Sequence, residues 1–87
     1  MPGVSRVGVD AAGSTIVGNL APTVLVNGSP VAVVGAQVAG HGRGPHSGPT
    51  MAAGSGKVYA NGIAVVRAGD PATCGHPASG SGDVIAG

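Results

Sequence analysis

Four side chains of this 87-residue chain have the chemistry to bind a metal ion: Cys74, His41, His46 and His76. They are the only cysteine and the only histidines in the sequence. Two stand in the segment His-Gly-Arg-Gly-Pro-His and two in Cys-Gly-His, where Gly75 gives the backbone the freedom to turn both side chains toward one ion. Structural zinc sites are tetrahedral with cysteine and histidine ligands, so this set predicts one bound Zn²⁺ with all four residues as ligands.

The segments that must position these ligands repeat along the chain. GSGKVYANG at residues 54–62 matches GSGDVIAG at residues 80–87, and TVLVNG at residues 23–28 is an earlier copy. Asn-Gly between β-rich runs is the strongest short-range signal for a hairpin with a type I′ turn. Each full copy therefore predicts a strand, an Asn-Gly turn and a second strand, followed by a glycine-rich excursion. Pro30, just past the first turn, fits an edge strand or a strand start.

The third copy of the repeat is divided between the two ends of the chain. Residues 4–10 match the second half of a unit and residues 82–87 its first half. We therefore expect the two ends to pair and close a pseudo-threefold arrangement. In it the Asn-Gly turns lie at one end and the four ligands at the other, two from each of two excursions. No stretch has helical periodicity, so the sequence predicts an all-β domain with long loops and at most a short helical turn within residues 47–55.

The composition explains why such a domain would need a metal. The chain has 18 glycines, 7 prolines, no Phe or Trp and a single aromatic residue, Tyr59, which leaves a thin core of Val, Ile and Ala. Domains this small usually add disulfides, a metal or oligomerisation, and one cysteine excludes an internal disulfide. Disorder is the alternative that the glycine and proline content raises. A net charge of only +1 and patterned β-branched residues argue against it.

Charge and hydropathy exclude several classes of function. The four Lys and Arg residues are scattered, without the basic stripe or aromatic platform that a nucleic-acid site requires. The longest apolar stretch is far short of a bilayer span, and no targeting segment is visible. A lone cysteine fits a reducing compartment. The sequence predicts a single domain over residues 1–87, without extension domains, made in the cytoplasm without a signal peptide.

A catalytic zinc centre is the alternative to a structural one. Such centres keep three protein ligands and an open position for water, and Asp70 would then be the candidate base. Four candidate ligands close the site, which favours a structural role and a protein that is not an enzyme. The glycine-rich segments at residues 40–44 and 54–58 lack the helix, or the Ser or Thr after the lysine, of a phosphate-binding loop.

The chain resembles the PAAR-repeat proteins over essentially its whole length. The most specific parts of the resemblance are TVLVNGSPVA at residues 23–32 and VRAGDPATCGH at residues 66–76. The Pro-Ala-Ala-Arg signature itself is degenerate, because residues 30–33 lack the arginine and residues 63–67 lack the proline. The first excursion, residues 11–22, contains no His or Cys and so contributes no ligand.

This resemblance implies a cone-shaped, PAAR-like β-domain with zinc at its apex, bound by three histidines and one cysteine. It further implies a structural tip that caps and sharpens a trimeric β-helical spike, VgrG-like or of a phage tail, and helps pierce a target cell envelope. We expect a type VI secretion system, with a phage tail baseplate as the alternative and a small zinc hydrolase as the less favoured one. The implied partners are the spike trimer, bound through the base of the cone, effector cargo and, transiently, the target membrane. The tip would leave the cell on the spike, as a secreted or virion-associated protein.

Overall fold

The computed structural model describes residues 3–82 and 84–85, in which the named elements are two β-hairpins and one short helical turn. In order along the chain these elements are β1 (Leu25–Val26), β2 (Ser29–Pro30), η1 (Gly44–His46), β3 (Tyr59–Ala60) and β4 (Ile63–Ala64). β1 pairs antiparallel with β2, and β3 with β4. Isolated β-bridges and turns connect the rest. No helix in these described ranges has the length and apolar character that a membrane crossing needs.

Both hairpins turn through Asn-Gly, as the sequence predicts. Asn27 and Gly28 have φ of 53° and 83°, and Asn61 and Gly62 have φ of 51° and 78°. Positive φ at both central residues is the requirement of a type I′ turn, which Asn tolerates and Gly adopts without strain. Pro30 lies in β2 of a two-stranded sheet, so the prediction of an edge position is confirmed.

The short helical turn lies earlier than the sequence indicated. It is the 3₁₀ turn η1, whereas no helical turn occurs within residues 47–55. A proline stands in the first turn of η1, where its fixed φ suits a helical start and its missing N–H costs nothing. Ser47 then ends the turn, because its amide and its hydroxyl both donate to the Gly44 carbonyl, at 3.1 and 2.9 Å.

The third repeat unit closes across the two ends of the chain. Gly3 forms an antiparallel bridge with Ile85, and the Val4 amide donates to the Val84 carbonyl at 2.8 Å. The two hairpins make the equivalent bond, at 2.8 and 3.1 Å, from Val31 to Val24 and from Val65 to Val58. The expected pairing of the chain ends is confirmed for these residues, while positions 83, 86 and 87 of the repeat lie outside the described residues.

A closed ring of three hydrogen bonds joins the three units at their centre. The Ser5 amide donates to the Val66 carbonyl (2.9 Å), Val66 to Ala32 (2.9 Å), and Ala32 back to Ser5 (3.0 Å). All three residues are fully buried. Because each segment bonds to both of the others in the same way, the ring fixes a pseudo-threefold axis through the middle of the domain.

The core consists of two small clusters of Ala, Val, Ile and Met. The first cluster contains Ala12, Ile16, Ala32, Ala36, Val38, Met51, Val66, Ala72 and Ala78, with Val7 and Cys74 packed against it. The second contains Val4, Ala21, Val26, Val31, Val33, Ala60 and Val65. Seven of these sixteen buried side chains are Ala and seven are Val, which bury little apolar area each, so the core is as thin as the composition predicts.

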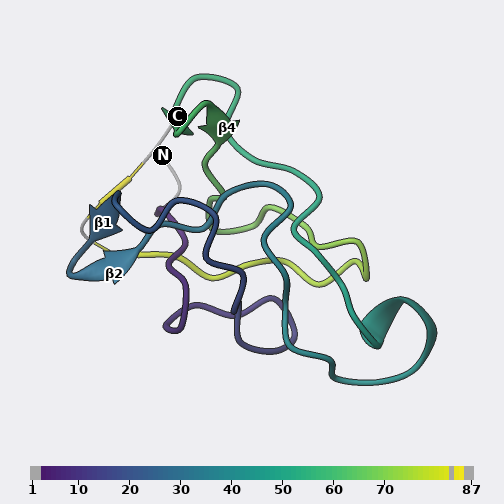
Figure 1. Cartoon of the computed structure of the whole chain (residues 1–87). Coiled ribbons are helices and arrows are strands. Elements are labelled where there is room, and N and C mark those ends of the chain that lie inside the picture. Colours follow the sequence, from purple (N-terminus) through teal and green to yellow (C-terminus); the bar gives the residue numbers. More distant parts are fainter. Residues whose placement is uncertain (1–2, 83, 86–87) are drawn as a thin grey trace.

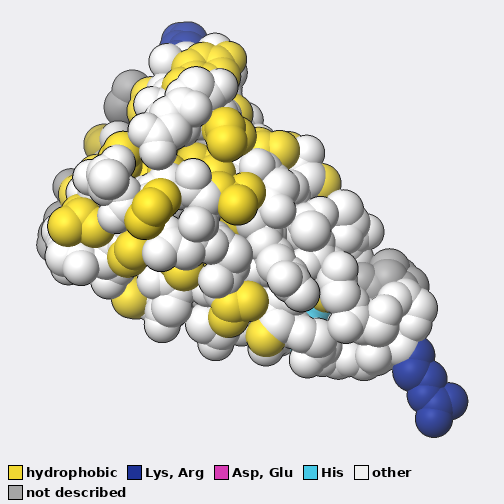
Figure 2. Space-filling model, in the orientation of Figure 1, with side chains coloured by type: hydrophobic (Ala, Val, Ile, Leu, Met, Phe, Trp, Pro, Cys, Tyr) yellow, Lys and Arg dark blue, Asp and Glu magenta, His cyan; other side chains and the backbone are white. Residues whose placement is uncertain are grey.

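The molecule is an elongated cone of 32 × 23 × 22 Å. The two hairpins lie together at its broad end, and η1 lies at the opposite, narrow end (Figure 1). Figure 2 shows the same taper in the molecular surface. We call the hairpin end the base and the other end the apex. The predicted fold, a small pseudo-threefold cone of β-hairpins with long loops, is confirmed.

Candidate metal centre at the apex

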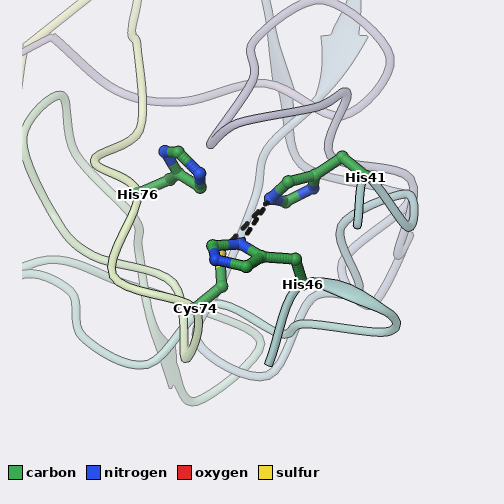
Figure 3. Close-up of side chains that lie close together, drawn as sticks. All are labelled: His41, His46, Cys74 and His76. Atoms are coloured by element: carbon green, nitrogen blue, oxygen red, sulfur yellow. Dashed lines mark hydrogen bonds between the residues drawn. The ribbon is translucent and has the colours of Figure 1, made fainter. Parts of the chain in front are cut away.

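The structure brings together all four residues that the sequence singled out: His41, His46, Cys74 and His76. Each offers one ligand atom, and these atoms all lie within 4.8 Å of one another. His41, His46 and Cys74 are half-buried and His76 is exposed. The side chains converge on one point (Figure 3). The group could therefore hold a metal ion, with two candidate ligands from each of two loops.

The two ligand-bearing loops are closed by backbone bonds at their necks. In the longer loop the Val38 amide donates to the Pro49 carbonyl and the His41 amide to the His46 carbonyl, both at 2.8 Å. This inner closure holds His41 beside His46, the last residue of η1. Backbone hydrogen bonds thus define the shape of both loops without a bound ion.

The shorter loop turns at a glycine. Gly75 has φ of 89°, and its amide donates to the Ala72 carbonyl at 2.9 Å. The Ala72 amide in turn donates to the His76 carbonyl at 3.0 Å, which closes the loop. A left-handed residue between Cys74 and His76 lets two side chains only two positions apart face the same point.

Two of the distances within the group are close to the edges of a tetrahedral zinc site, and the whole set lies within 4.8 Å. His41 Nε2 lies 3.1 Å from His46 Nδ1 and 3.6 Å from Cys74 Sγ. Ordinary Zn–N and Zn–S bonds give ligand–ligand edges of about 3.3 and 3.6 Å in a tetrahedron. The three imidazole centroids are 4.9–5.0 Å apart and their planes cross at 56–66°. The three rings thus surround a common point, as ligands of one small ion do.

A second interaction orients the His41 ring. Its Nδ1 lies 3.1 Å from the Ala39 carbonyl oxygen. A carbonyl can only accept, so Nδ1 carries the proton and, in the neutral ring, Nε2 presents its lone pair to the other ligands. Histidine ligands of metal ions usually donate their second N–H to such an acceptor. His41 is therefore already in the tautomer that metal binding through Nε2 needs.

Asp70, the base that a catalytic zinc centre would use, is committed elsewhere. Its Oδ2 accepts from the Arg67 amide and Nε at 2.8 and 2.9 Å, and its Oδ1 accepts from Arg67 Nη2 at 3.0 Å. The hydrogen bond to Asp70 also raises the pKa of Arg67. Asp70 is buried and is not among the grouped ligands. This arrangement makes it a structural partner of Arg67.

The first repeat unit contains the equivalent ion pair. Arg6 Nε donates to Asp10 Oδ2 at 2.7 Å, and the Ser79 hydroxyl donates to Asp10 Oδ1 at 2.9 Å. Burial by itself would raise the pKa of Asp10, but the hydrogen bonds from Arg6 and Ser79 together hold that pKa below its ordinary value. Both aspartates therefore stabilise loops below the apex.

One residue of the apex was missed by the sequence interpretation. Gly13, in the loop without ligands, lies so close to the rings of His41 and His76 that any side chain there would meet them. A signal existed in the repeat: Gly13 follows Asp10-Ala11-Ala12 as Thr73 follows Asp70-Pro71-Ala72, one position before Cys74. The third loop thus reaches the site although it supplies no ligand.

The base carries a second candidate site, an apolar surface with a central hollow. Six exposed apolar side chains form what we call the apolar base: Val24, Leu25, Val58, Tyr59, Val84 and Ile85. They line an open hollow of about 230 Å³ whose floor includes Val4, Val31 and Val65. Hydrophobic side chains gather at this broad end (Figure 2). Each repeat unit supplies one adjacent pair, so the surface follows the pseudo-threefold axis.

Comparison with known proteins agrees with the resemblance read from the sequence. No curated protein matches the chain. The family model described as the PAAR motif matches residues 9–87, a span that contains all four candidate ligands. PAAR proteins are structural rather than enzymatic, are spike tips of contractile injection systems, and cap VgrG-type spikes. Since the match covers nearly the whole chain, this protein belongs to the PAAR-motif family.

Proposed function

We propose that this protein is a zinc-stabilised tip that caps and sharpens the trimeric β-helical spike of a type VI secretion system and helps it pierce a target cell envelope. The observation that carries the proposal is the apolar base, with its three pairs of exposed apolar side chains around one axis. A tip in this position would leave the cell with the spike.

The apolar base has the form that a threefold partner requires. Symmetric assemblies match symmetry operators across an interface, so a single chain makes equivalent contacts with all three subunits of a trimer when it repeats its contact surface three times. Residues 24–25, 58–59 and 84–85 do this, with exposed fractions of 36–59 %. A contiguous exposed apolar patch of this kind is typical of a protein–protein interface. A partner that fits such a surface is the blunt end of a trimeric spike.

The rest of the described surface is poor in charge, which suits passage through a lipid bilayer. Arg43 and Lys57 are the only exposed charged residues in the described ranges, because Asp10 and Asp70 are buried against arginines. On the face in Figure 2, dark blue side chains stand only at the two ends of the molecule. Each charge taken into a membrane is costly, so pairing and burying charges lowers the barrier to penetration.

Zinc is the metal that fits the ligand group best. Three imidazoles and one cysteine sulfur are a ligand set typical of structural zinc, and together they would fill all four positions of a tetrahedral ion. When bound, the ion supplies a cross-link between the two ligand-bearing loops. In small domains such a site contributes roughly 10–16 kcal/mol of apparent binding free energy at neutral pH. That contribution would keep the apex rigid on a core made largely of Ala and Val.

The direct test is to mix the zinc-loaded protein with a purified trimeric spike and measure the mass of the complex by light scattering. We expect one tip per trimer. Leu25→Asp places a charge in the apolar base and should weaken binding at least tenfold, the effect of about 1.4 kcal/mol. Leu20→Asp is the matched control, since Leu20 is similarly exposed (47 %) but lies outside the apolar base.

Two outcomes would contradict the proposal. One is the absence of a complex with a type VI spike and with a phage tail spike. The other is equal weakening by Leu25→Asp and Leu20→Asp, which would place the contact elsewhere. Binding to the phage tail spike alone would keep the role of a spike tip but place the protein in a phage tail and not in a type VI secretion system.

A further inference from the structure

We infer that Gly13 is a positioning residue of the metal centre: its lack of a side chain is what allows the imidazoles of His41 and His76 to converge on one ion. This inference rests on the proposed metal centre. It assigns a function to the loop that has no ligand. The apex is thus built by three loops, two that supply donors and one that supplies space.

The space at Gly13 is occupied by the two rings. A Cβ atom on Gly13 would lie 2.5 Å from Cδ2 and 2.8 Å from Cγ of His76, and 2.7 Å from Nε2 of His41. Carbon atoms pack at about 3.5–4.0 Å, so each of these contacts is a severe overlap. His41 Nε2 is the atom that faces His46 and Cys74. A methyl group at position 13 would therefore press on a ligand atom itself.

The backbone of this loop has little freedom to retreat. Ala11 and Thr15 form a β-bridge at its neck. The Ser79 amide donates to the Ala11 carbonyl and the Ala39 amide to the Thr15 carbonyl, both at 2.9 Å. These two bonds tie the loop to both ligand-bearing loops. Because the backbone is held on both sides, relief of an added Cβ has to come from rotation of the imidazoles.

Rotation of the imidazoles affects the metal-free and the metal-bound protein differently. Without an ion the rings can turn about their side-chain torsions at small cost. With an ion their nitrogen atoms are fixed to within a few tenths of an ångström by the bond lengths. The cost of a side chain at position 13 therefore falls on the bound state, and it appears as lost metal affinity rather than as lost folding.

Gly8 offers a matched control for this prediction. Both glycines have positive φ, 86° at Gly13 and 79° at Gly8, so alanine has a similar backbone cost at either position. A Cβ on Gly8, however, has no atom within 4 Å. The difference between Gly13→Ala and Gly8→Ala thus isolates the crowding of the two rings from the strain of the backbone.

The experiment measures Zn²⁺ affinity by competition with a chromophoric chelator for the wild type, Gly13→Ala and Gly8→Ala. We expect Gly13→Ala to bind about 10–100-fold more weakly than Gly8→Ala, the range found when groups that orient metal ligands are changed. Co²⁺ loading adds a spectroscopic readout, because its absorption bands report tetrahedral thiolate coordination. These bands should be lost or shifted in Gly13→Ala only.

A double-mutant cycle covers the case in which Gly13→Ala folds poorly. In a His76→Ala background the ring that lies nearest to position 13 is gone, so adding Gly13→Ala should cost clearly less affinity than it does in the wild type. Equal affinities of Gly13→Ala and Gly8→Ala, or an unchanged cost in the His76→Ala background, would overturn the inference. A wild-type protein that binds no Zn²⁺ would instead overturn the proposed metal centre on which the inference rests.

Discussion

The three repeat units are alike at the base of the cone and differ from one another at its apex. At the base the three units are alike: each presents one pair of adjacent apolar side chains beside a common axis. At the apex the loops are closed by equivalent bridges, Ala11–Thr15, Gln37–Thr50 and Pro71–Pro77, yet they differ in length and content. A symmetric partner requires repetition, whereas one ion requires a specific set of donors. The three units therefore remain similar to one another at the end where a trimer would bind, and they differ at the end where an ion would bind.

The middle of the cone lies between the symmetric base and the asymmetric apex and has features of both. The ring of hydrogen bonds through Ser5, Ala32 and Val66 keeps all three backbones equivalent. Side chains around it already differ: two units have an Arg–Asp ion pair, while the corresponding backbone bond in the remaining unit joins Ala36 to Val33. The asymmetry thus begins at the middle, where the Arg6–Asp10 turn is also one residue longer than the Arg67–Asp70 turn, and it is largest in the apical loops.

The largest effect should follow from loss of the apical metal. Cys74→Ala removes one of the four candidate ligands, and chelation removes the ion itself. Because a structural zinc site in a small domain carries much of its folding free energy, each should lower the stability by about 5 kcal/mol or more. For a domain of this size that is a fall of roughly 20 °C or more in Tm, measurable by circular dichroism.

Leu25→Ser at the base is the matching variant for this comparison. Leu25 is 59 % exposed, so the substitution should change Tm by only a few degrees and leave the metal content unchanged. A protein whose Tm does not respond to chelation would contradict the assignment of stability to the apex. A large fall in Leu25→Ser would remove the contrast between the two ends.

Much of this comparison could be predicted from the sequence. Asn27-Gly28 and Asn61-Gly62 carry their turn type in their residue types, because few other pairs accept positive φ at both positions. The pairing of the chain ends followed from the split repeat. The four candidate ligands could be singled out because His41, His46, Cys74 and His76 are the whole supply of those residue types.

The remaining features depend on contacts that no local pattern encodes. The repeat aligns Gly13 with the residue before Cys74, but it does not show that two rings from distant segments lie against position 13. Ser79 bonds Asp10 across most of the chain. The position of η1 depends on how the second loop closes on itself through His41 and His46. These are tertiary contacts, and the repeat indicates only which loops can make them.

A smaller effect is expected in the middle of the cone, at low pH. The pKa of Asp10 is held below its ordinary value in the folded protein, so its contribution to stability is fully present above the unfolded pKa and is lost as pH falls through the folded value. Asp10→Asn should therefore cost about 1–2 kcal/mol at pH 7 and progressively less below about pH 4. Urea unfolding of both proteins at matched Zn²⁺ across this range measures the difference.

Ser79→Ala provides the control for the Asp10 prediction. It removes one of the hydrogen bonds that lower the pKa and keeps the ion pair with Arg6. Its pH-dependent loss should have the same sign as that of Asp10→Asn and be smaller. A difference between the wild type and Asp10→Asn that grows as pH falls below 4 would have the wrong sign and would exclude this account of the ion pair.

The smallest effect should lie at the base, in the hairpin turns. Alanine in the left-handed region costs roughly 1 kcal/mol, so Asn61→Ala should lower the stability by about that amount. Asn27→Ala should cost somewhat more, because the Asn27 amide group also donates to the Ser81 hydroxyl at 3.1 Å and so links the first hairpin to the C-terminal segment. Asn19→Ala is the control, since Asn19 is exposed and does not have positive φ. If thermal unfolding gave equal losses for Asn27→Ala and Asn61→Ala, the two hairpins would be energetically alike and the base more symmetric than its hydrogen bonds indicate.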